Sequence, residues 1–186
     1  MKTQYFGSRN QMGASLIEVL VAVLILSFGL LSLGAMLSYS VQLPKLSGHR
    51  TIATNIASDH IERIRANPGE FTIGTYTVAS NYDGTFNPVA TAECAFPNCT
   101  STTLAAMDIA ATRSALRAQL PGGSLMVNCD GGNCAASNAV GNLWVIWQEP
   151  QTSAALDGAN SDSCPATVIA AAFDPKPRCL YVKFKV

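Results

Sequence analysis

The chain has 186 residues, of which 48% are hydrophobic and 13% are charged, and its formal net charge at pH 7 is zero. This length leaves room for one globular domain beside a long helix. Nonspecific binding of nucleic acid requires a basic surface, which this composition does not offer, so we expect no nucleic-acid partner.

An uncharged apolar run extends from Val19 to Val41. About 20 helical residues at about 1.5 Å each cover the hydrocarbon core of a bilayer, which is about 30 Å thick. A secretory signal peptide is the alternative, but its apolar region usually has about 7–15 residues and precedes the cleavage site. Here the small residues Gly13 and Ala14 precede the run, so cleavage between them leaves the span attached. We therefore expect a leader over residues 1–13 and a membrane-spanning half-helix over residues 14–41.

Glu18 places a carboxylate at the edge of this run. An ionised side chain at the centre of a bilayer costs about 2.5–3.5 kcal/mol, and less near the interface, so Glu18 calls for a functional explanation and a partner. After cleavage the amino group of Ala14 lies one helical turn away, where it can neutralise Glu18 within one chain or across to a neighbouring span. Removal of Lys2 and Arg9 with the leader leaves 10 basic against 12 acidic side chains, since the whole chain has 12 of each.

The sequence Gly13-Ala14-Ser15-Leu16-Ile17-Glu18, followed by a long apolar helix, resembles the class III leader of type IV pilins and of the pseudopilins of type II secretion. The resemblance implies cleavage after Gly13 by the prepilin peptidase, N-methylation of Ala14 and a role for Glu18 in subunit docking. Major subunits of the family usually begin with Phe, whereas the mature chain here begins with Ala14. This departure bears on methylation more than on cleavage.

The helix is expected to continue over residues 42–67 as an amphipathic half. Apolar residues and one histidine recur there at spacings of three and four, which is the helical pattern: Ala53, Ile56, Ala57, His60, Ile61 and Ile64. Asp59 and Arg63 predict an i,i+4 ion pair, and Asn67-Pro68-Gly69 predicts the end of the helix. Pro44 should kink the helix, because proline removes one hydrogen bond and clashes with the preceding turn.

Residues 68–186 are expected to form a globular head. A short strand is predicted over Phe71 to Val78, and a second helix over residues 103–120 that ends at Pro121-Gly122-Gly123. Three further strands are predicted over Leu125–Cys129, Leu143–Gln148 and Cys179–Val186. In the last of them apolar residues alternate with polar ones, which predicts one buried face: Leu180, Val182, Phe184 and Val186. A long helix packed on an antiparallel sheet is an α+β fold, and it agrees with the pilin fold that the leader implies.

Six cysteines in a domain that follows a membrane span indicate an oxidising compartment. Other connectivities are open to six cysteines, but we expect a disulfide-stapled head with three local bridges: Cys94 with Cys99, Cys129 with Cys134, and Cys164 with Cys179. The spacing of the first two pairs also permits a zinc site. The compartment favours disulfides, and His49 and His60 lie far in sequence from any cysteine, so we expect no metal and no other cofactor.

Several other groups of residues allow a purely structural interpretation as well as a functional one. The segment Asp130-Gly131-Gly132-Asn133 lacks the alternating oxygen ligands of a calcium loop and predicts a tight turn. Trp144 and Trp147 predict core and edge packing rather than a ligand platform. Four charges on the first helix suggest either a partner contact or a solvated face: Asp59, Glu62, Arg63 and Arg65. The sequence contains no recognisable nucleophile motif, phosphate loop or carboxylate dyad, so we expect no enzyme activity.

Three blocks of the chain resemble the PilV-type minor pilins, sometimes labelled type IV pilus modification proteins: Ile61 to Pro68, Asp108 to Gly123, and Trp144 to Trp147. The resemblance implies a minor pilin that acts with other minor pilins in assembly, priming or the tip complex of a type IV pilus. It implies as partners other minor pilins, the major pilin, the prepilin peptidase and inner-membrane lipid, with a tip adhesin as a further candidate.

The same resemblance implies a single-pass protein of the bacterial inner membrane with a periplasmic head, which then enters the pilus fibre or its tip. Such fibres serve cell adhesion, twitching motility or DNA uptake. Two alternatives remain. One is a binding module, either an adhesin or a DNA-binding tip subunit, although no basic stripe supports the latter. The other is a minor pseudopilin of type II secretion, which shares the mechanism and differs in the machine.

Overall fold

The computed structural model describes residues 15–95, 97–135, 139–149, 162–169, 173 and 176–186. The chain divides between Leu43 and Pro44 into two compact units, and each is described by itself. The expected cleavage site, Gly13 and Ala14, lies outside the described residues.

Helix α1 (Leu16–Ala66) begins at the first described residues. The carbonyl of Ser15 accepts hydrogen bonds from the backbone amides of Glu18 and Val19 at 2.9 and 3.2 Å. Pro44 lies inside α1, and the helix continues through it. The kink expected at Pro44 stays a prediction.

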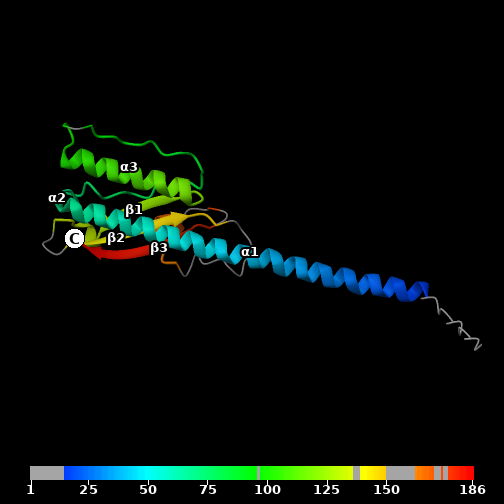
Figure 1. Ribbon diagram of the computed structural model, residues 1–186. Helices are drawn as coiled ribbons and strands as arrows, with labels where there is room; N and C mark the ends of the chain where they lie inside the picture. Colours follow the sequence, from blue (N-terminus) through cyan, green and yellow to red (C-terminus); the bar gives the residue numbers. More distant parts are fainter. Residues whose placement is uncertain (1–14, 96, 136–138, 150–161, 170–172, 174–175) are drawn as a thin grey trace, which may run out of the picture. The chain divides into compact units, whose positions relative to one another are not determined.

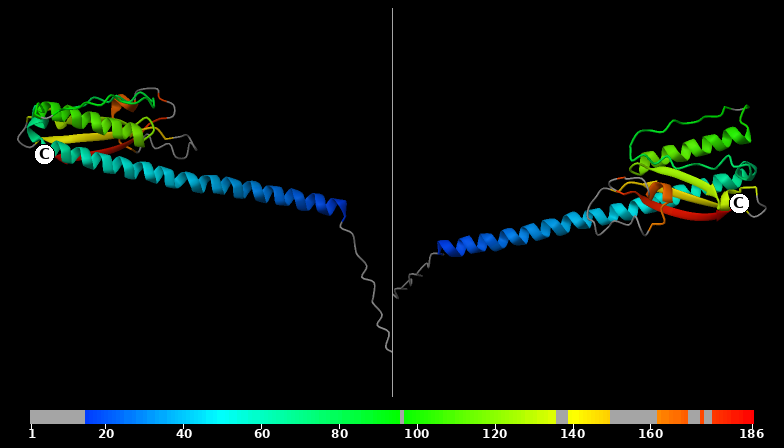
Figure 2. Two further views of the ribbon diagram at one scale, coloured as in Figure 1. Left: turned by 45° about the horizontal axis from the view of Figure 1, so that its top comes forward. Right: turned by 180° about the vertical axis from the view of Figure 1, so that it is seen from behind.

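In the second unit, α1 packs on a three-stranded antiparallel sheet, and helix α3 (Ser101–Gln119) lies beside it over the sheet (Figure 1). The strands are β1 (Ser124–Cys129), β2 (Val140–Trp147) and β3 (Arg178–Lys185), in the order β1-β2-β3. Figure 2 gives two further views of this arrangement. Three short elements complete the unit: α2 (Pro68–Thr72), the 3₁₀ helix η1 (Asp130–Gly132) and α4 (Ala166–Ile169).

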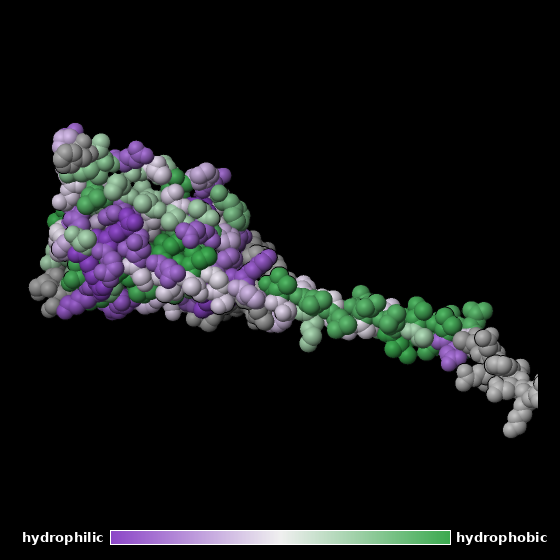
Figure 3. Space-filling view, viewed as in Figure 1, coloured by the Kyte–Doolittle hydropathy of each residue, from purple (hydrophilic) through white to green (hydrophobic). Residues whose placement is uncertain are grey.

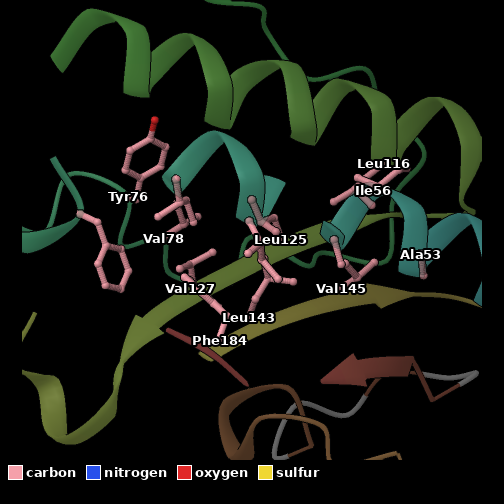
Figure 4. Packing of buried hydrophobic residues seen from close by; sticks show 14 of the residues in the cluster. Ala53, Ile56, Tyr76, Val78, Leu116, Leu125, Val127, Leu143, Val145 and Phe184 are labelled. Carbon is pink, nitrogen blue, oxygen red and sulfur yellow. The ribbon is translucent and has the colours of Figure 1, made fainter. Parts of the chain in front are cut away.

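The core lies where the apolar stripe of α1 meets the sheet and α3 (Figure 4). All six residues predicted from the helical spacing are buried, from Ala53 to Ile64, so the amphipathic pattern is confirmed. They meet the inward side chains of the strands, among them Leu125, which pairs in register with Val145. Full burial of a Leu or Ile side chain contributes roughly 1.5–3 kcal/mol, which makes this stripe the main attachment of α1 to the sheet.

The predicted second helix is confirmed as α3. Thr100 caps its N-terminus: the Thr100 side chain accepts from the amide of Thr103 at 3.2 Å, and the Thr103 hydroxyl accepts from the amide of Thr100 at 2.8 Å. This reciprocal capping box satisfies backbone donors that the first turn would otherwise leave unpaired. The helix ends at Gln119, two residues before Pro121, as the turn signal predicts.

The strand predicted over Phe71 to Val78 is wrong. Pro68 starts the short helix α2 instead, since proline lacks the N–H that a first helical turn leaves unpaired and has a suitable φ. Gly74 then turns the chain with a φ of +87°, a value that favours glycine. Within this segment the pairing with the sheet is a single bridge between Val78 and Val127.

The three predicted strands of the sheet are confirmed within a few residues at their ends. On β3, Phe184 is buried and its ring covers Gly141, its partner on β2, so closely that no side chain fits at that glycine. Leu180 and Val182 are partly buried against the core. Val186, predicted on the same buried face, is 38% exposed, because β3 ends at Lys185.

Three disulfides staple the head, and they join the expected local pairs: Cys94–Cys99, Cys129–Cys134 and Cys164–Cys179. The second closes the turn after β1, where Gly131 has a φ of 64°, so the tight turn is also confirmed. The third joins the residues before α4 to the start of β3. Together with the long helix and the antiparallel sheet they make a pilin-like α+β fold.

Candidate functional site

The described part of the first unit is an apolar helix whose surface is exposed. Its large apolar side chains are exposed along the whole run, for example Phe28 at 66% and Leu31 at 71%. The face seen in Figure 3 is hydrophobic along this part of α1. Burial of apolar surface is worth about 25 cal/mol per Å², so such a surface requires lipid or other helices around it. By length and composition, α1 can cross a membrane.

Two hydroxyls inside this run are satisfied within the helix. The hydroxyls of Ser27 and Ser32 donate to the carbonyls of Leu24 and Gly29 at 2.8 and 2.9 Å. In hydrocarbon an unpaired hydroxyl would be costly, so these bonds suit a lipid environment. At Gly29 and Gly34 nothing lies within 4 Å of where a Cβ would stand, and such small residues let a second helix approach closely.

Glu18 is the only charged side chain between Ser15 and Leu43. It lies in the first turn of α1 and is exposed, and the positive end of the helix dipole favours a carboxylate there by about 0.3–1 kcal/mol. The span itself therefore supplies no cation for Glu18. The amino group of Ala14 lies outside the described residues, so its pairing with Glu18 stays a prediction.

The second unit holds a buried polar cluster between α1, α3 and the turn after α2. Asp108 of α3 is 6% exposed and accepts hydrogen bonds from the Tyr76 hydroxyl at 2.7 Å and from Arg63 Nη1 at 3.1 Å. Arg63 also donates from Nε to Asp59 at 2.8 Å, and both carboxylates raise the pKa of Arg63. Burial raises the pKa of Tyr76, and its bond to Asp108 raises it further.

Our reading of the sequence missed this cluster. The signal that could have found it is a charged residue on the apolar face of α3, where Asp108 stands between Ala105 and Thr112 and all three side chains are buried. A carboxylate at such a position requires a buried cation or hydroxyl. The partners could not be read from spacing, because they lie on other elements.

His60 lies beside the cluster and is completely buried. Its Nδ1 is 2.8 Å from the hydroxyl oxygen of Thr112, and its ring meets the ring of Tyr76 edge-on at 6.0 Å. Burial lowers the pKa of His60 to about 4, while Asp108 acts in the opposite direction. The residue is thus part of the core, on the face of α1 that the helical spacing predicted to be buried. Among the described residues no group of three or more His, Cys, Asp or Glu is placed to hold a metal ion.

Folding stability is expected to fall as the pH drops from 6.5 to 4. The pKa of His60 is about 4 in the folded chain against an ordinary value of 6.5, so in this window the unfolded chain binds the proton more strongly. The loss approaches about 3 kcal/mol once the pH is below the folded pKa. Urea unfolding of the full chain in detergent, measured across this range, should show a shallower pH slope for His60→Leu than for the wild type. Equal slopes in the two proteins would show that His60 is not the source of the pH dependence.

The four charged side chains near the C-terminal end of α1 form two groups: Asp59 with Arg63, and Glu62 with Arg65. Arg63 turns toward the buried Asp108, whereas Arg65 donates to Glu62 at 2.6 Å on the exposed surface and to the carbonyl of Lys185 at 3.3 Å. Exposed pairs of this kind contribute about 0–1 kcal/mol, so the Glu62–Arg65 pair is a solvated feature with little effect on stability.

The tryptophans pack as the sequence predicts. Trp147 is fully buried, and its Nε1 donates to Glu149 at 3.2 Å. Trp144 is partly buried and stacks on Tyr181 with ring centroids 5.0 Å apart. Core and edge packing are therefore confirmed.

One comparison with known proteins gives a match. A family model described as Tt1218-like, type IV pilin Tt1218, matches residues 35–110, which are less than half of the chain. The matched residues run from within the apolar half of α1 through α2 into α3. Type IV pilins are structural proteins rather than enzymes. No curated protein and no solved structure gives a match. The match begins after the leader-like sequence around Gly13 and Glu18, so the resemblance of that sequence to a class III leader stays a prediction.

Proposed function

We propose that this chain is a minor pilin, which acts with other minor pilins in the assembly, priming or tip complex of a type IV pilus. The observation that carries the proposal is the exposed apolar half of α1 with Glu18 as its single charge, in one chain with a pilin-like head. The match of residues 35–110 to type IV pilins supports it.

In this proposal the apolar half of α1 has two successive environments. It first lies in the lipid of the inner membrane, and in the fibre the spans of other subunits cover the same side chains. Transfer from one to the other keeps apolar surface away from water at both stages, so it requires no exposure of residues such as Phe28 and Leu31. The head lies in the periplasm, where an oxidising environment maintains its three disulfides.

Glu18 sets the register between subunits in this proposal. Cleavage after Gly13 by the prepilin peptidase creates an amino group on Ala14, and N-methylation leaves that group positively charged. A carboxylate inside a bundle of apolar helices is strongly favoured beside such a cation. Glu18 of one subunit therefore docks against the Ala14 amine of its neighbour. An uncleaved chain has no such amine to offer to the Glu18 of another subunit.

A minor rather than a major role is favoured by the blocks that resemble PilV-type pilins, Ile61 to Pro68 and Trp144 to Trp147 among them. Other minor pilins and the major pilin are then its partners in the fibre. A pseudopilin of type II secretion would use α1 and Glu18 in the same way, so the two roles are separated by which subunits surround the chain.

The proposal is tested by the amount of the chain in purified fibres. We expect sheared pili to contain it in processed form, beginning at Ala14, at a small fraction of the most abundant pilin, as measured by quantitative mass spectrometry. As a control, Gly13→Leu should block processing and leave the chain in the membrane fraction. Equal abundance with the main subunit would assign a major pilin instead, and recovery only with type II secretion components would assign a pseudopilin.

A further inference from the structure

A pocket of about 290 Å³ opens between the second half of α1 and α3, entirely within the second unit. Four residues of α1 and four of α3 line it: Asn55, Ile56, Asp59 and Arg63 from α1, and Ala111, Thr112, Ala115 and Gln119 from α3. Sites for small ligands usually have about 300–1,000 Å³, so this one is sized for little more than a single long side chain.

The wall of the pocket is apolar and its rim is polar. Ile56 is only 9% exposed. Ala111 and Ala115 leave space beside it, because their side chains end at Cβ. Asn55 and Gln119 are exposed and contribute side-chain amides, whose carbonyl oxygens accept hydrogen bonds. The hydroxyl of Thr112 already meets His60 at 2.8 Å, so it belongs to the core rather than to the rim.

Asp59 and Arg63 are the charged side chains that line the pocket, and Arg63 also binds the buried Asp108, which does not line it. Asp59 and Asp108 share one cation, Arg63, at 2.8 and 3.1 Å, which leaves one negative charge over the three side chains. Asp108 is buried and also bonded to Tyr76, whereas the Asp59 side chain is 60% exposed. Within the described part of the chain, Arg63 is the only hydrogen-bond partner of the Asp59 carboxylate. The surplus charge is thus accessible at Asp59.

We propose that this pocket receives a lysine or arginine side chain from a neighbouring pilin subunit. Such a side chain has a methylene stem that matches the wall formed by Ile56, Ala111 and Ala115, and a cationic end that pairs with Asp59. The amide carbonyls of Asn55 and Gln119 accept its remaining hydrogen bonds. An acidic side chain would meet the surplus negative charge, and an apolar one would remove water from Asp59 without replacing its hydrogen bonds.

This inference rests on the proposed function, because the partner is a fibre subunit. It assigns the head a contact of its own, separate from the docking of Glu18 in the apolar helices. The contact joins α1 and α3 of one subunit to a basic residue of another, so it selects a partner by charge, which close packing of apolar spans cannot do.

The test uses a photo-crosslinking residue at Gln119 of the full chain, expressed in cells that assemble the fibre. We expect crosslinked peptides from another pilin subunit that contain a lysine or arginine at or next to the crosslinked position, identified by mass spectrometry. Asp59→Asn should lower the crosslinking yield about fivefold, the effect of losing a partly exposed ion pair. The matched control is Asp130→Asn, which removes an exposed aspartate that pairs with Lys183 at 2.8 Å on the turn after β1. It should leave the yield unchanged.

A second variant covers the case in which Asp59→Asn weakens the head. Asn55→Lys leaves the Asp59–Arg63 pair intact, places a positive charge at the rim and should lower the yield by at least the same factor. An unchanged yield in both variants, or crosslinks only to peptides without a basic residue, overturns the inference. A second crosslinking position at Phe28, in the apolar run, reports on the proposed function separately. Pilin contacts from Phe28 without any from Gln119 refute the pocket alone, whereas the absence of pilin contacts from both refutes the proposed function as well.

Discussion

Replacement of Asp108 by alanine is expected to lower the free energy of unfolding by about 2–4 kcal/mol. The buried hydroxyl of Tyr76 donates to Asp108 at 2.7 Å, and leaving such a donor unpaired costs about 1–3 kcal/mol. Arg63 loses its inner partner at the same time, but its side chain is 38% exposed, so water replaces part of that bond and adds about 1 kcal/mol at most. Urea unfolding of the full chain in detergent measures the loss.

The matched control for Asp108 is the second aspartate that Arg63 contacts. Asp59→Ala also removes one ion pair of Arg63, at 2.8 Å, but the Asp59 side chain is 60% exposed. The loss should therefore stay below about 1 kcal/mol. Similar losses for the two variants would mean that the burial of Asp108 and its bond to Tyr76 do not matter to stability.

Replacement of Glu18 by alanine should leave the chain cleaved and inserted in the membrane but lower its incorporation into fibres by about 10-fold to 100-fold. In the proposed register the change leaves the Ala14 amine of a neighbour without a counter-charge among apolar side chains. An unpaired charge there costs up to about 2.5–3.5 kcal/mol, and about 1.4 kcal/mol corresponds to a factor of ten. Immunoblots of sheared fibres and of membranes, with equal expression, give the two quantities.

Two further substitutions separate charge from shape at Glu18. Glu18→Gln keeps the size of the side chain and removes the charge, so it should behave like Glu18→Ala. Glu18→Asp keeps the charge on a shorter side chain, so it should retain part of the incorporation. Normal incorporation of Glu18→Gln would show that the carboxylate is not the docking group, and the proposed register would then fail.

The sequence predicted those parts of the fold that depend on local periodicity. The spacing of Ala53, Ile56 and Ile64 fixes which side of α1 is buried, and the alternation on β3 does the same for the sheet. Each pattern works because one element has one apolar face, whatever it packs against. The local cysteine pairs fall in the same class, because Cys129 and Cys134 are separated by a single turn.

Other features depend on contacts between distant segments and could not be predicted in the same way. Arg63 and Asp108 are 45 positions apart, and Tyr76 and Asp108 are 32 apart, so no spacing rule connects them. The wrong prediction of a strand over Phe71 to Val78 has a related cause. Its apolar residues suited a strand, but the proline favours a first helical turn, and Gly74 turns the chain away before pairing can extend beyond Val78.

The two outer strands of the sheet have a consequence for the proposed pilin role, in which many copies of the chain pack side by side. Unpaired strand edges are templates for aggregation between copies, and lysine on an edge strand opposes such pairing. At the edge of β1, Val78 exchanges two backbone hydrogen bonds with Val127, at 2.8 and 2.9 Å, and so occupies part of it. At the other edge, β3 carries Lys183 and Lys185, both exposed, and Arg65 of α1 bonds the last carbonyl of the strand. In the proposed fibre, subunits can therefore pack together through their helices while their sheets stay apart.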